Sequence, residues 1–302
     1  MVLNKSPETI AIIGPTATGK TRIGVEIAKK LGSDVISVDS QLVYQGLNIG
    51  VAKPTIEEMQ GIRHHMIDVA PPTVTFSAGD YAEMARPLLK HNSVLVGGTG
   101  FYLRALLQPD HLPPIQTDPR IRARLKEYLA SNGPQMLYQN LQNSDPRRAA
   151  QLHPNDTTRV IRALEVIEHT GKPIPQTPTH LAFPVKLIGL TYRDRDLHRQ
   201  IIRTRLRQMM ADGFLEEVDA LYQTHGFCAA MQKAHGYAEL LDVLTGKRTL
   251  EDALLQVEIN IRQYARRQMT WFRKIPDIHW FYVDETKPDT ILLSIIDERD
   301  CV

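Results

Sequence analysis

An eight-residue segment near the N-terminus constrains this chain more than any other feature. Gly14-Pro15-Thr16-Ala17-Thr18-Gly19-Lys20-Thr21 fits the pattern G-x-x-x-x-G-K-[ST], and it stands between a β-rich run, 9–13, and a helical run, 20–31. In such a loop the glycines let backbone N–H groups surround a phosphate, the lysine adds a positive charge, and the threonine hydroxyl can bind Mg²⁺. The segment therefore predicts a phosphate site of the type that binds ATP and other nucleotides.

Short apolar runs alternate with helical periods over the first hundred or so residues. We expect a second strand at 34–38, a helix near 78–89 and a third strand at 93–96, which leads into the turn Gly97-Gly98-Thr99-Gly100 and another helix. This alternation is typical of a parallel sheet with helices on both faces. The predicted fold is α/β, with a P-loop NTPase-like parallel sheet core flanked by helices.

Two proline-rich segments, 110–119 and 172–178, interrupt the alternation. Between them lies a helical pattern of about sixty residues, with helices expected at 119–131 and 157–170. Strand character returns at 185–190, and the chain is then mostly helical over 196–274. We therefore predict a catalytic core made of residues 1–112 and 181–302, with a mainly helical inserted domain at 113–180.

The composition excludes several classes of protein. The 36 basic and 34 acidic residues leave a net charge of only +2, so any nucleic-acid footprint must be local. Cys228 and Cys301 are far apart, which predicts neither a disulfide framework nor a zinc site. The chain has no run of 18 apolar residues and no apolar leader, so we expect a soluble, cytoplasmic protein without a membrane partner.

The phosphate loop does not by itself identify the molecule that carries the phosphate. Kinases and NTPases usually place a carboxylate at the end of a later strand to hold Mg²⁺, but the strand at 93–96 ends in Gly97-Gly98-Thr99. The nearest carboxylate, Asp39, could serve Mg²⁺, take a proton from a substrate, or act as the N-cap of a helix. The missing acid weakens a kinase function without excluding it, because nucleotide kinases also use acids near the second strand.

Several short motifs, spread in order over nearly the whole chain, resemble those of the tRNA dimethylallyltransferase family, also called tRNA isopentenyltransferases. Each motif is weak alone, but their order and spacing together are specific. Besides the loop 14–21 they are Asp39-Ser40 through Tyr44, Ile49–Pro54, Gly61–Asp68, Val96–Tyr102, His153–Asp156 with Arg159–Val166, Thr170–Pro173, Gly236-Tyr237 and Arg262–Trp271.

The resemblance implies a reaction and a set of roles. In this family the loop 14–21 grips the pyrophosphate of dimethylallyl pyrophosphate, with Mg²⁺ on Thr21. The exocyclic N6 of the adenine 3′ of the anticodon, position 37, attacks C1 of the allyl group; the products are N6-dimethylallyladenosine and pyrophosphate. By resemblance Asp39 is the general base, Thr99 holds the pyrophosphate and the bridging oxygen, and Arg205 neutralises the leaving group. From the residues alone, Thr99 could equally be part of an ordinary strand-to-helix turn. Arg205 could equally be one of the solvent-exposed arginines of a helix.

Basic side chains gather in the insertion and on the helix that contains Arg262. The resemblance implies that the insertion clamps the anticodon stem-loop while the target adenine flips out of its stack over Asp39. The predicted tRNA contacts are Asp39, Ser40, Gln41, Arg159, Arg162, Arg262 and Arg266. For any single arginine, a solvated helix face with salt bridges is the alternative.

Five positions depart from the family pattern, and all five spare the phosphate loop, Asp39 and Thr99. They are Leu42, Ile201, His235, Ala238 and Ile261. Three other functions stay open: an adenylate isopentenyltransferase acting on free nucleotide, a P-loop kinase or NTPase, and an RNA-binding protein with a relict loop. The insertion argues against the first, since a mononucleotide needs no clamp. By family analogy we expect a monomer.

Overall fold

The computed structural model describes residues 9–90, 92–108, 118–173 and 184–300. The chain divides into two compact units, one of Met1–Leu107 with Leu181–Val302 and the other of Gln108–His180. The predicted domain boundaries at 112/113 and 180/181, most of the two proline-rich segments, and Cys301 lie outside the described residues. The division into core and inserted domain therefore stays a prediction at its exact boundaries.

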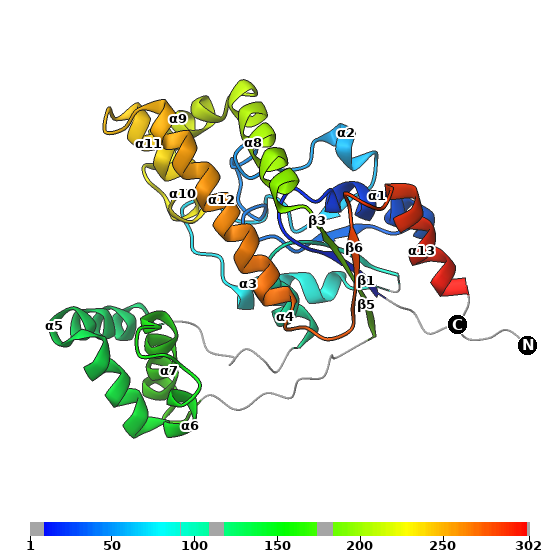
Figure 1. Cartoon of the computed structure of the whole chain (residues 1–302). Helices are drawn as coiled ribbons and strands as arrows, with labels where there is room; N and C mark the ends of the chain where they lie inside the picture. The colour runs from blue at the N-terminus through cyan, green and yellow to red at the C-terminus, as the bar shows by residue number, and fades with distance from the viewer. Residues whose placement is uncertain (1–8, 91, 109–117, 174–183, 301–302) are drawn as a thin grey trace, which may run out of the picture. The chain divides into compact units, whose positions relative to one another are not determined.

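In the described part of the first unit, six parallel strands form one sheet in the order β3-β2-β4-β1-β5-β6 (Figure 1). This confirms the predicted α/β fold. Because β1 lies between β4 and β5, the loop that follows β1 starts from the middle of the sheet. The strands are β1 Thr9–Ile13, β2 Val35–Ser37, β3 His64–His65, β4 Val94–Gly97, β5 Val185–Thr191 and β6 Ile278–Tyr282.

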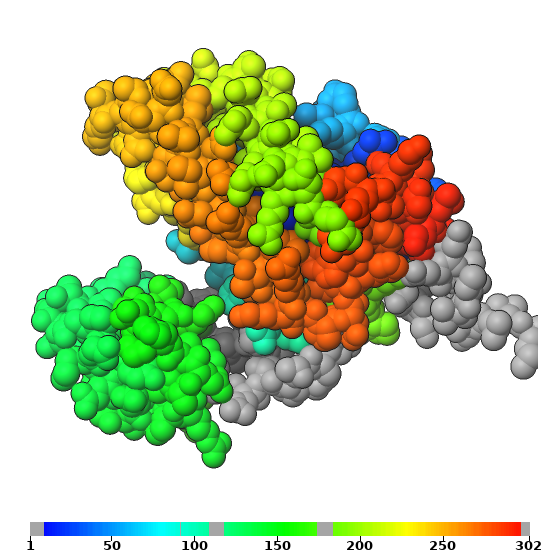
Figure 2. Space-filling model, in the orientation of Figure 1, coloured from blue at the N-terminus to red at the C-terminus, as the bar shows by residue number. Residues whose placement is uncertain are grey.

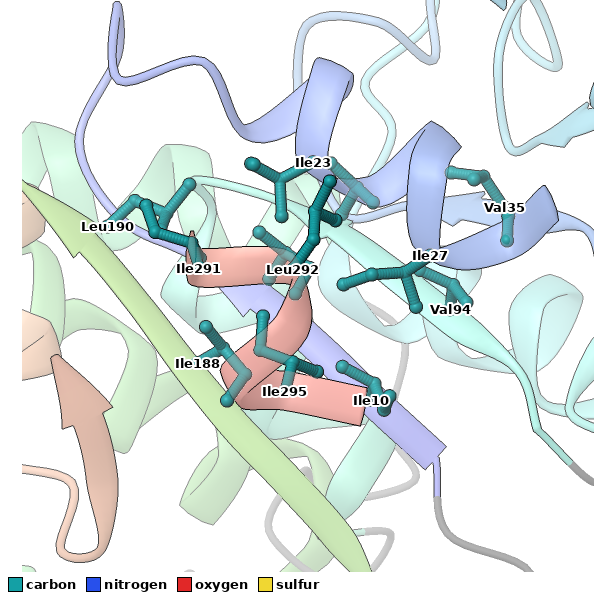
Figure 3. Close-up of a cluster of buried hydrophobic side chains, with 13 residues drawn as sticks. Ile10, Ile23, Ile27, Val35, Val94, Ile188, Leu190, Ile291, Leu292 and Ile295 are labelled. Carbon is teal, nitrogen blue, oxygen red and sulfur yellow. The ribbon is translucent and has the colours of Figure 1, made fainter. Parts of the chain in front are cut away.

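Two helices, α1 (Lys20–Leu31) and α13 (Pro288–Asp300), cover one face of the sheet. Ile10 and Ile12 of β1 are fully buried in one apolar cluster on this face, and Figure 3 shows branched side chains of both helices gathered near Ile10. Burying a side chain of this size contributes about 1.5–3 kcal/mol. The cluster also includes Ile23, Ile27, Val35, Val94, Ile188, Leu190, Ile291, Leu292 and Ile295. It fixes α1, and with it the phosphate loop, on the sheet.

Three helices lie on the other face: α3 (Ala78–Ala85), α4 (Gly100–Leu107) and α12 (Leu250–Phe272) (Figure 1). Tyr81 of α3 stacks on Tyr102 of α4 with the ring centroids 4.3 Å apart. The Tyr81 hydroxyl also donates to the backbone oxygen of Ser37, at 2.8 Å. A buried tyrosine needs such a partner for its hydroxyl, so this pair joins both helices to the carboxyl end of β2.

The long helices α8 (Arg195–Ala211) and α12 pack side by side on the face seen in Figure 2. Arg203 of α8 forms a two-pronged ion pair with Glu258 of α12, with N···O distances of 2.8 and 3.1 Å. The other elements of this unit are α2 Ile56–Met59, η1 Arg86–Leu88, α9 Phe214–His225, α10 Ala229–Lys233 and α11 Tyr237–Leu244. Among the described residues, no helix has both the length and the apolar content needed to cross a bilayer.

The second unit is helical and has its own core. It contains α5 (Pro119–Ser144), α6 (Pro146–Ala149) and α7 (Thr157–Thr170), which begin after the capping side chains of Asp118, Asp145 and Asp156. The core side chains are Leu125, Leu137, Leu141, Ala149, Val160, Ile161, Ala163 and Leu164. Aspartate caps and a shared apolar stripe explain why this segment folds into helices.

Several elements differ from the sequence prediction. The first stretch of α5 ends close to the predicted boundary at 131, because Gly133, with φ 80°, interrupts the helix. A second helical stretch, which the sequence analysis did not predict, starts at Pro134 and continues to Ser144. The sequence pattern does not predict β3, which has only two polar residues, nor β6 and α13 near the C-terminus. Strands at the edge of a sheet, such as β3 and β6, form because a neighbouring strand offers hydrogen bonds. The pattern of residues within the segment itself gives no sign of that neighbour.

Candidate functional site

Three loops meet at the carboxyl edge of the sheet: 14–19 after β1, 38–41 after β2, and 97–99 after β4. The Thr99 N–H donates to the Val38 oxygen at 3.0 Å, and the Ser40 N–H donates to Thr99 Oγ1 at 2.9 Å. These bonds hold the predicted residues Asp39, Ser40 and Thr99 next to one another. Ligands of open α/β sheets bind at this edge.

The phosphate loop has the backbone that its sequence demands. Gly14 has φ 143°, and a Cβ there would lie 2.1 Å from the Leu190 oxygen of β5, so only glycine fits. The Pro15 oxygen accepts from the Thr18 hydroxyl at 3.0 Å and from Lys20 Nζ at 2.6 Å. Thr21 follows in the first turn of α1, half-buried. The loop is thus closed on itself, with the lysine curled over it.

Lys20, Asp39 and Arg205 form a charged cluster above these loops. Burial lowers the pKa of Lys20 to about 8, although the Asp39 carboxylate acts in the opposite direction. Burial likewise raises the pKa of Asp39, opposed by its backbone hydrogen bonds and by Lys20 and Arg205. The Arg205 side chain keeps contact with solvent, yet desolvation by neighbouring protein atoms lowers its pKa, while Glu58 and Asp39 raise it. The cluster joins α1, the loop after β2, and α8.

The Asp39 carboxylate also has a local hydrogen bond, because its Oδ1 accepts from the Gln41 N–H at 2.9 Å. The bond caps a turn at residues 40–43 and not the start of a helix, so Asp39 is not the N-cap that the sequence left open. The contact orients the carboxylate while leaving it among the charged groups of the cluster. The Gln41 Oε1 atom is buried without a hydrogen-bond partner among the described residues. It is an acceptor available to a donor that enters the site.

Four further side chains complete this edge. Gln268 of α12 bonds to Thr16 and Gly98, and His198 of α8 contacts the Thr16 oxygen through Nε2 at 2.9 Å. Tyr192 stacks on His198 and donates to the Ala17 oxygen at 3.2 Å. Tyr264, whose pKa is raised by burial and then by the Asp39 carboxylate, lies beside the cluster. The only sequence signal was Gln268 and Tyr264 falling inside the Arg262–Trp271 motif.

The predicted tRNA contacts are not all in one place. Ser40 and Gln41 adjoin Asp39, whereas Arg159 and Arg162 belong to the second unit. Arg162 pairs with the fully buried Glu165 at 3.1 Å, and Arg159 pairs with Asp156 at 2.8 Å. On α12, Arg262 lies 3.7 Å from Glu258, and Arg266 is exposed. Arg159, Arg162 and Arg262 thus have the salt-bridge partners expected of arginines on a helix face.

Two of the departures from the family pattern, Leu42 and His235, touch this edge. The His235 ring packs on Tyr264 with centroids 5.0 Å apart, and burial lowers the pKa of His235. Leu42, Ala238 and Ile261 are half-buried, and Ile201 is exposed on α8. The backbone of Leu42 hydrogen-bonds to the Asp39 carboxylate, a contact that does not depend on the side chain. Nothing in the structure explains Ile201, Ala238 or Ile261 further.

The side chains near the phosphate loop favour a cation such as Mg²⁺ that is bound jointly by protein oxygens and a phosphate. They do not favour a metal bound by protein side chains alone. Among the described residues, no three His, Cys, Asp or Glu side chains gather as a metal site. His65 instead contacts Asp34 at 2.9 Å. The oxygens near the loop are the Thr21 hydroxyl and the Asp39 carboxylate, and Mg²⁺ commonly takes one or two such ligands while phosphate and water supply the rest.

Comparison with known proteins agrees with this architecture. A family model described as IPP transferase matches residues 42–275. A tRNA dimethylallyltransferase of Halalkalibacterium halodurans is 40% identical over 299 residues, covering 95% of this chain and 94% of the relative. One of Crocosphaera subtropica is 40% identical over 291 residues, covering 93% of each chain.

Solved structures match over nearly the whole chain. The tRNA isopentenylpyrophosphate transferase of Bacillus halodurans is 39% identical with a TM-score of 0.71, covering 98% of this chain and 97% of that one. A eukaryotic dimethylallyltransferase, described as acting on tRNA, has a TM-score of 0.82 at 26% identity, covering 97% and 79%. The extent of these matches confirms the resemblance drawn from the motifs: this chain belongs to the IPP transferase family.

Proposed function

We propose that this protein transfers the dimethylallyl group from dimethylallyl pyrophosphate to N6 of adenine 37 in tRNA. The observation that carries the proposal is the meeting of Lys20, Asp39, Thr99 and Arg205 at the carboxyl edge of the sheet. This edge offers cations for a pyrophosphate and, beside them, a carboxylate that can accept a proton. The names of the relatives, which are 36–40% identical to this chain, favour the same reaction.

The pyrophosphate occupies the loop 14–21 in this proposal. Lys20 and Arg205 face the charge that develops on the leaving group as the C1–O bond breaks, so they stabilise mainly the transition state. The Thr99 hydroxyl, held beside Ser40, reaches the bridging oxygen. When Mg²⁺ is bound, with Thr21 as its protein ligand, it adds further positive charge at the pyrophosphate.

Asp39 is the general base. As N6 of adenine bonds to C1, the C1–O bond breaks and its electron pair leaves with pyrophosphate, while one N6 proton passes to the Asp39 carboxylate. A positioned base of this kind contributes about 10²–10⁴-fold to the rate. Since only the ionised carboxylate accepts a proton, transfer declines as the pH falls through the raised pKa of Asp39.

The tRNA is bound through three sets of residues. Ser40 and Gln41 contact the flipped adenine beside Asp39, and the insertion, 113–180, clamps the anticodon stem-loop with Arg159 and Arg162. Arg262 and Arg266 of α12 contact phosphates. Extrusion of the base costs a few kcal/mol, which these contacts offset. We further propose that the protein acts as a monomer in the cytoplasm, where its tRNA substrate is found.

The test is incorporation of labelled dimethylallyl pyrophosphate into unmodified tRNA, with AMP and ATP as competing acceptors. We expect label in tRNA alone. The Asp39→Asn variant should lose about 10²–10⁴-fold in kcat and lack the acid limb of the wild-type pH profile. Asp277→Asn, a change of the same chemistry at an exposed turn, should behave as wild type.

The other outcomes separate the alternatives. Label found only in AMP would identify an adenylate isopentenyltransferase. Hydrolysis of ATP without any labelled acceptor would identify a kinase or NTPase use of the phosphate loop. Tight tRNA binding without transfer of label would favour a non-catalytic RNA-binding protein.

A further inference from the structure

Gln268 is one of the most buried polar side chains of the first unit, with 6% of its surface exposed. It lies in the last two turns of α12. A buried amide without hydrogen bonds would be costly, so its partners decide what the residue does. The reaction proposed above assigns it no role.

The two ends of the Gln268 amide bond to two different loops. Its Oε1 accepts from the Thr16 N–H at 3.0 Å, and its Nε2 donates to the Gly98 oxygen at 2.9 Å. Thr16 is part of the phosphate loop, and Gly98 immediately precedes Thr99. Because the oxygen only accepts and the nitrogen only donates, both bonds form in a single orientation of the amide.

The glycine turn leaves room for this contact and for its neighbour on α12. A Cβ on Gly98 would lie 2.2 Å from Gln268 Nε2, and a Cβ on Gly100 would lie 2.0 Å from the Trp271 ring. Tyr264, one turn earlier on α12, lies close enough to Asp39 for the carboxylate to raise its pKa. Residues 264, 268 and 271 are spaced so that they share one face of a helix. That face of α12 is therefore pressed against the turn that carries Thr99.

We propose that Gln268 is a positioning residue that sets the distance between the phosphate loop and the Thr99 turn. The inference rests on the proposed binding of a pyrophosphate by the loop 14–21. The pyrophosphate must reach the loop N–H groups and the Thr99 hydroxyl at once, so a small change in their spacing weakens both contacts. One amide bonded to both segments holds that spacing in the empty protein.

Gln268→Met tests this by removing both hydrogen bonds at nearly constant size. We expect the affinity for inorganic pyrophosphate, measured by calorimetry, to fall about tenfold or more, because two buried polar groups lose their partner. The KM for dimethylallyl pyrophosphate should rise in parallel while the KM for tRNA stays unchanged. Gln263→Met, the same change on the exposed side of α12, should leave all three values at the wild-type level.

Gln268→Glu gives a second signature that a packing defect would not produce. A protonated glutamic acid can still donate to the Gly98 oxygen, whereas a carboxylate is repelled by it. We expect the ratio of its pyrophosphate affinity to that of wild type to recover as the pH is lowered from about 8.5 to about 6, since burial raises carboxyl pKa values. Lys20, His198 and Asp39 titrate in both proteins, so their effect cancels in the ratio.

Wild-type pyrophosphate affinity and KM in Gln268→Met would overturn the inference, and so would a Gln268→Glu ratio that does not change with pH. If Gln268→Met merely reduced the fraction of folded protein, the apparent kcat would fall while the pyrophosphate affinity and the KM values stayed at the wild-type level. That result would also contradict the inference. If wild type binds pyrophosphate but transfers nothing to tRNA, the proposed function fails while the binding comparison still tests Gln268. If transfer occurs and Gln268→Met binds normally, only the inference fails.

Discussion

Lys20 bends back over its own loop, with Nζ 2.6 Å from the Pro15 oxygen. Burial removes water from the ammonium group, and this lowers the pKa of Lys20 to about 8 in the free protein. A lysine with an ordinary pKa would stay charged through the whole neutral and mildly alkaline range. Here the charge that attracts a pyrophosphate is partly titrated within that range.

The pH dependence of substrate capture should show this titration. A lysine is charged below its pKa, so kcat/KM for dimethylallyl pyrophosphate should fall as the pH rises through about 8, as seen in a pH profile. Lys20→Met should be impaired at every pH and lack the alkaline limb. A wild-type profile that is flat up to about pH 10, near the ordinary lysine pKa, would contradict the assignment.

Residues of the site differ in how far the sequence could predict them. Gly14, Lys20 and Thr21 lie in one motif whose local backbone does the binding, so their place follows from eight consecutive residues. Gln268 and His198 contact Thr16 from 252 and 182 positions away. No local pattern encodes such contacts, because they depend on how α8 and α12 pack against the sheet.

Among the elements, strand β4 ends at a residue that has no room for a side chain. A Cβ on Gly97 would lie 2.0 Å from the Val38 oxygen, a backbone atom that cannot move aside. Gly97→Ala should therefore lower the free energy of unfolding by about 1–3 kcal/mol or more, measured by urea denaturation. Gly79→Ala is the matched control: its Cβ would meet only Ser77 Oγ at 3.4 Å in a helix, so stability should rise by about 0.5–1 kcal/mol. Equal effects of the two changes would contradict this explanation.

The loop 48–50 depends on helix α9 for its conformation. Glu217 accepts from the backbone N–H groups of Asn48, Ile49 and Gly50 at 2.9, 2.8 and 3.1 Å, and from the Tyr237 hydroxyl at 2.6 Å. Glu217→Gln should cost about 1–3 kcal/mol of stability in thermal denaturation, because an NH₂ group then faces a hydrogen-bond donor. Glu216→Gln, at the exposed neighbouring position, should change stability little. If the two variants have the same melting temperature, Glu217 contributes no more to stability than an exposed carboxylate does.

The elements also differ in how well the sequence predicted them. Strand β1 and helix α1 begin and end where the apolar pattern predicts, since both lie in the buried centre of the sheet. The first stretch of α5 ends near the predicted residue 131, at Gly133, whereas the second stretch, which begins at Pro134, was not predicted. The two-residue strand His64–His65 has no apolar run, and it exists only through its pairing with β2.

At the scale of the whole molecule, the second unit should fold without the first. Its apolar side chains form a separate core, and the buried Glu165 is paired with Arg122 and Arg162 of the same unit. A fragment of residues 118–173 should therefore be helical by circular dichroism and melt cooperatively. Leu141→Ala, at a fully buried position, should remove about 2–5 kcal/mol and unfold it, whereas Met136→Ala, at an exposed one, should not. A fragment without helical signal would show that the unit needs the rest of the chain.

The sequence order of the sheet also sets the order in which the site can form. Strand β5, which pairs directly with β1, is synthesised only after the helical unit, and α12 follows later still. The phosphate loop therefore leaves the ribosome long before Gln268, its hydrogen-bond partner on α12. While the chain is being synthesised, the phosphate loop is already present. Its hydrogen-bond partner Gln268 is not, so the loop is not yet held in the geometry that it has in the finished protein. Competence to capture a pyrophosphate is in this sense a late event of biosynthesis, reached only when nearly the whole chain has been made.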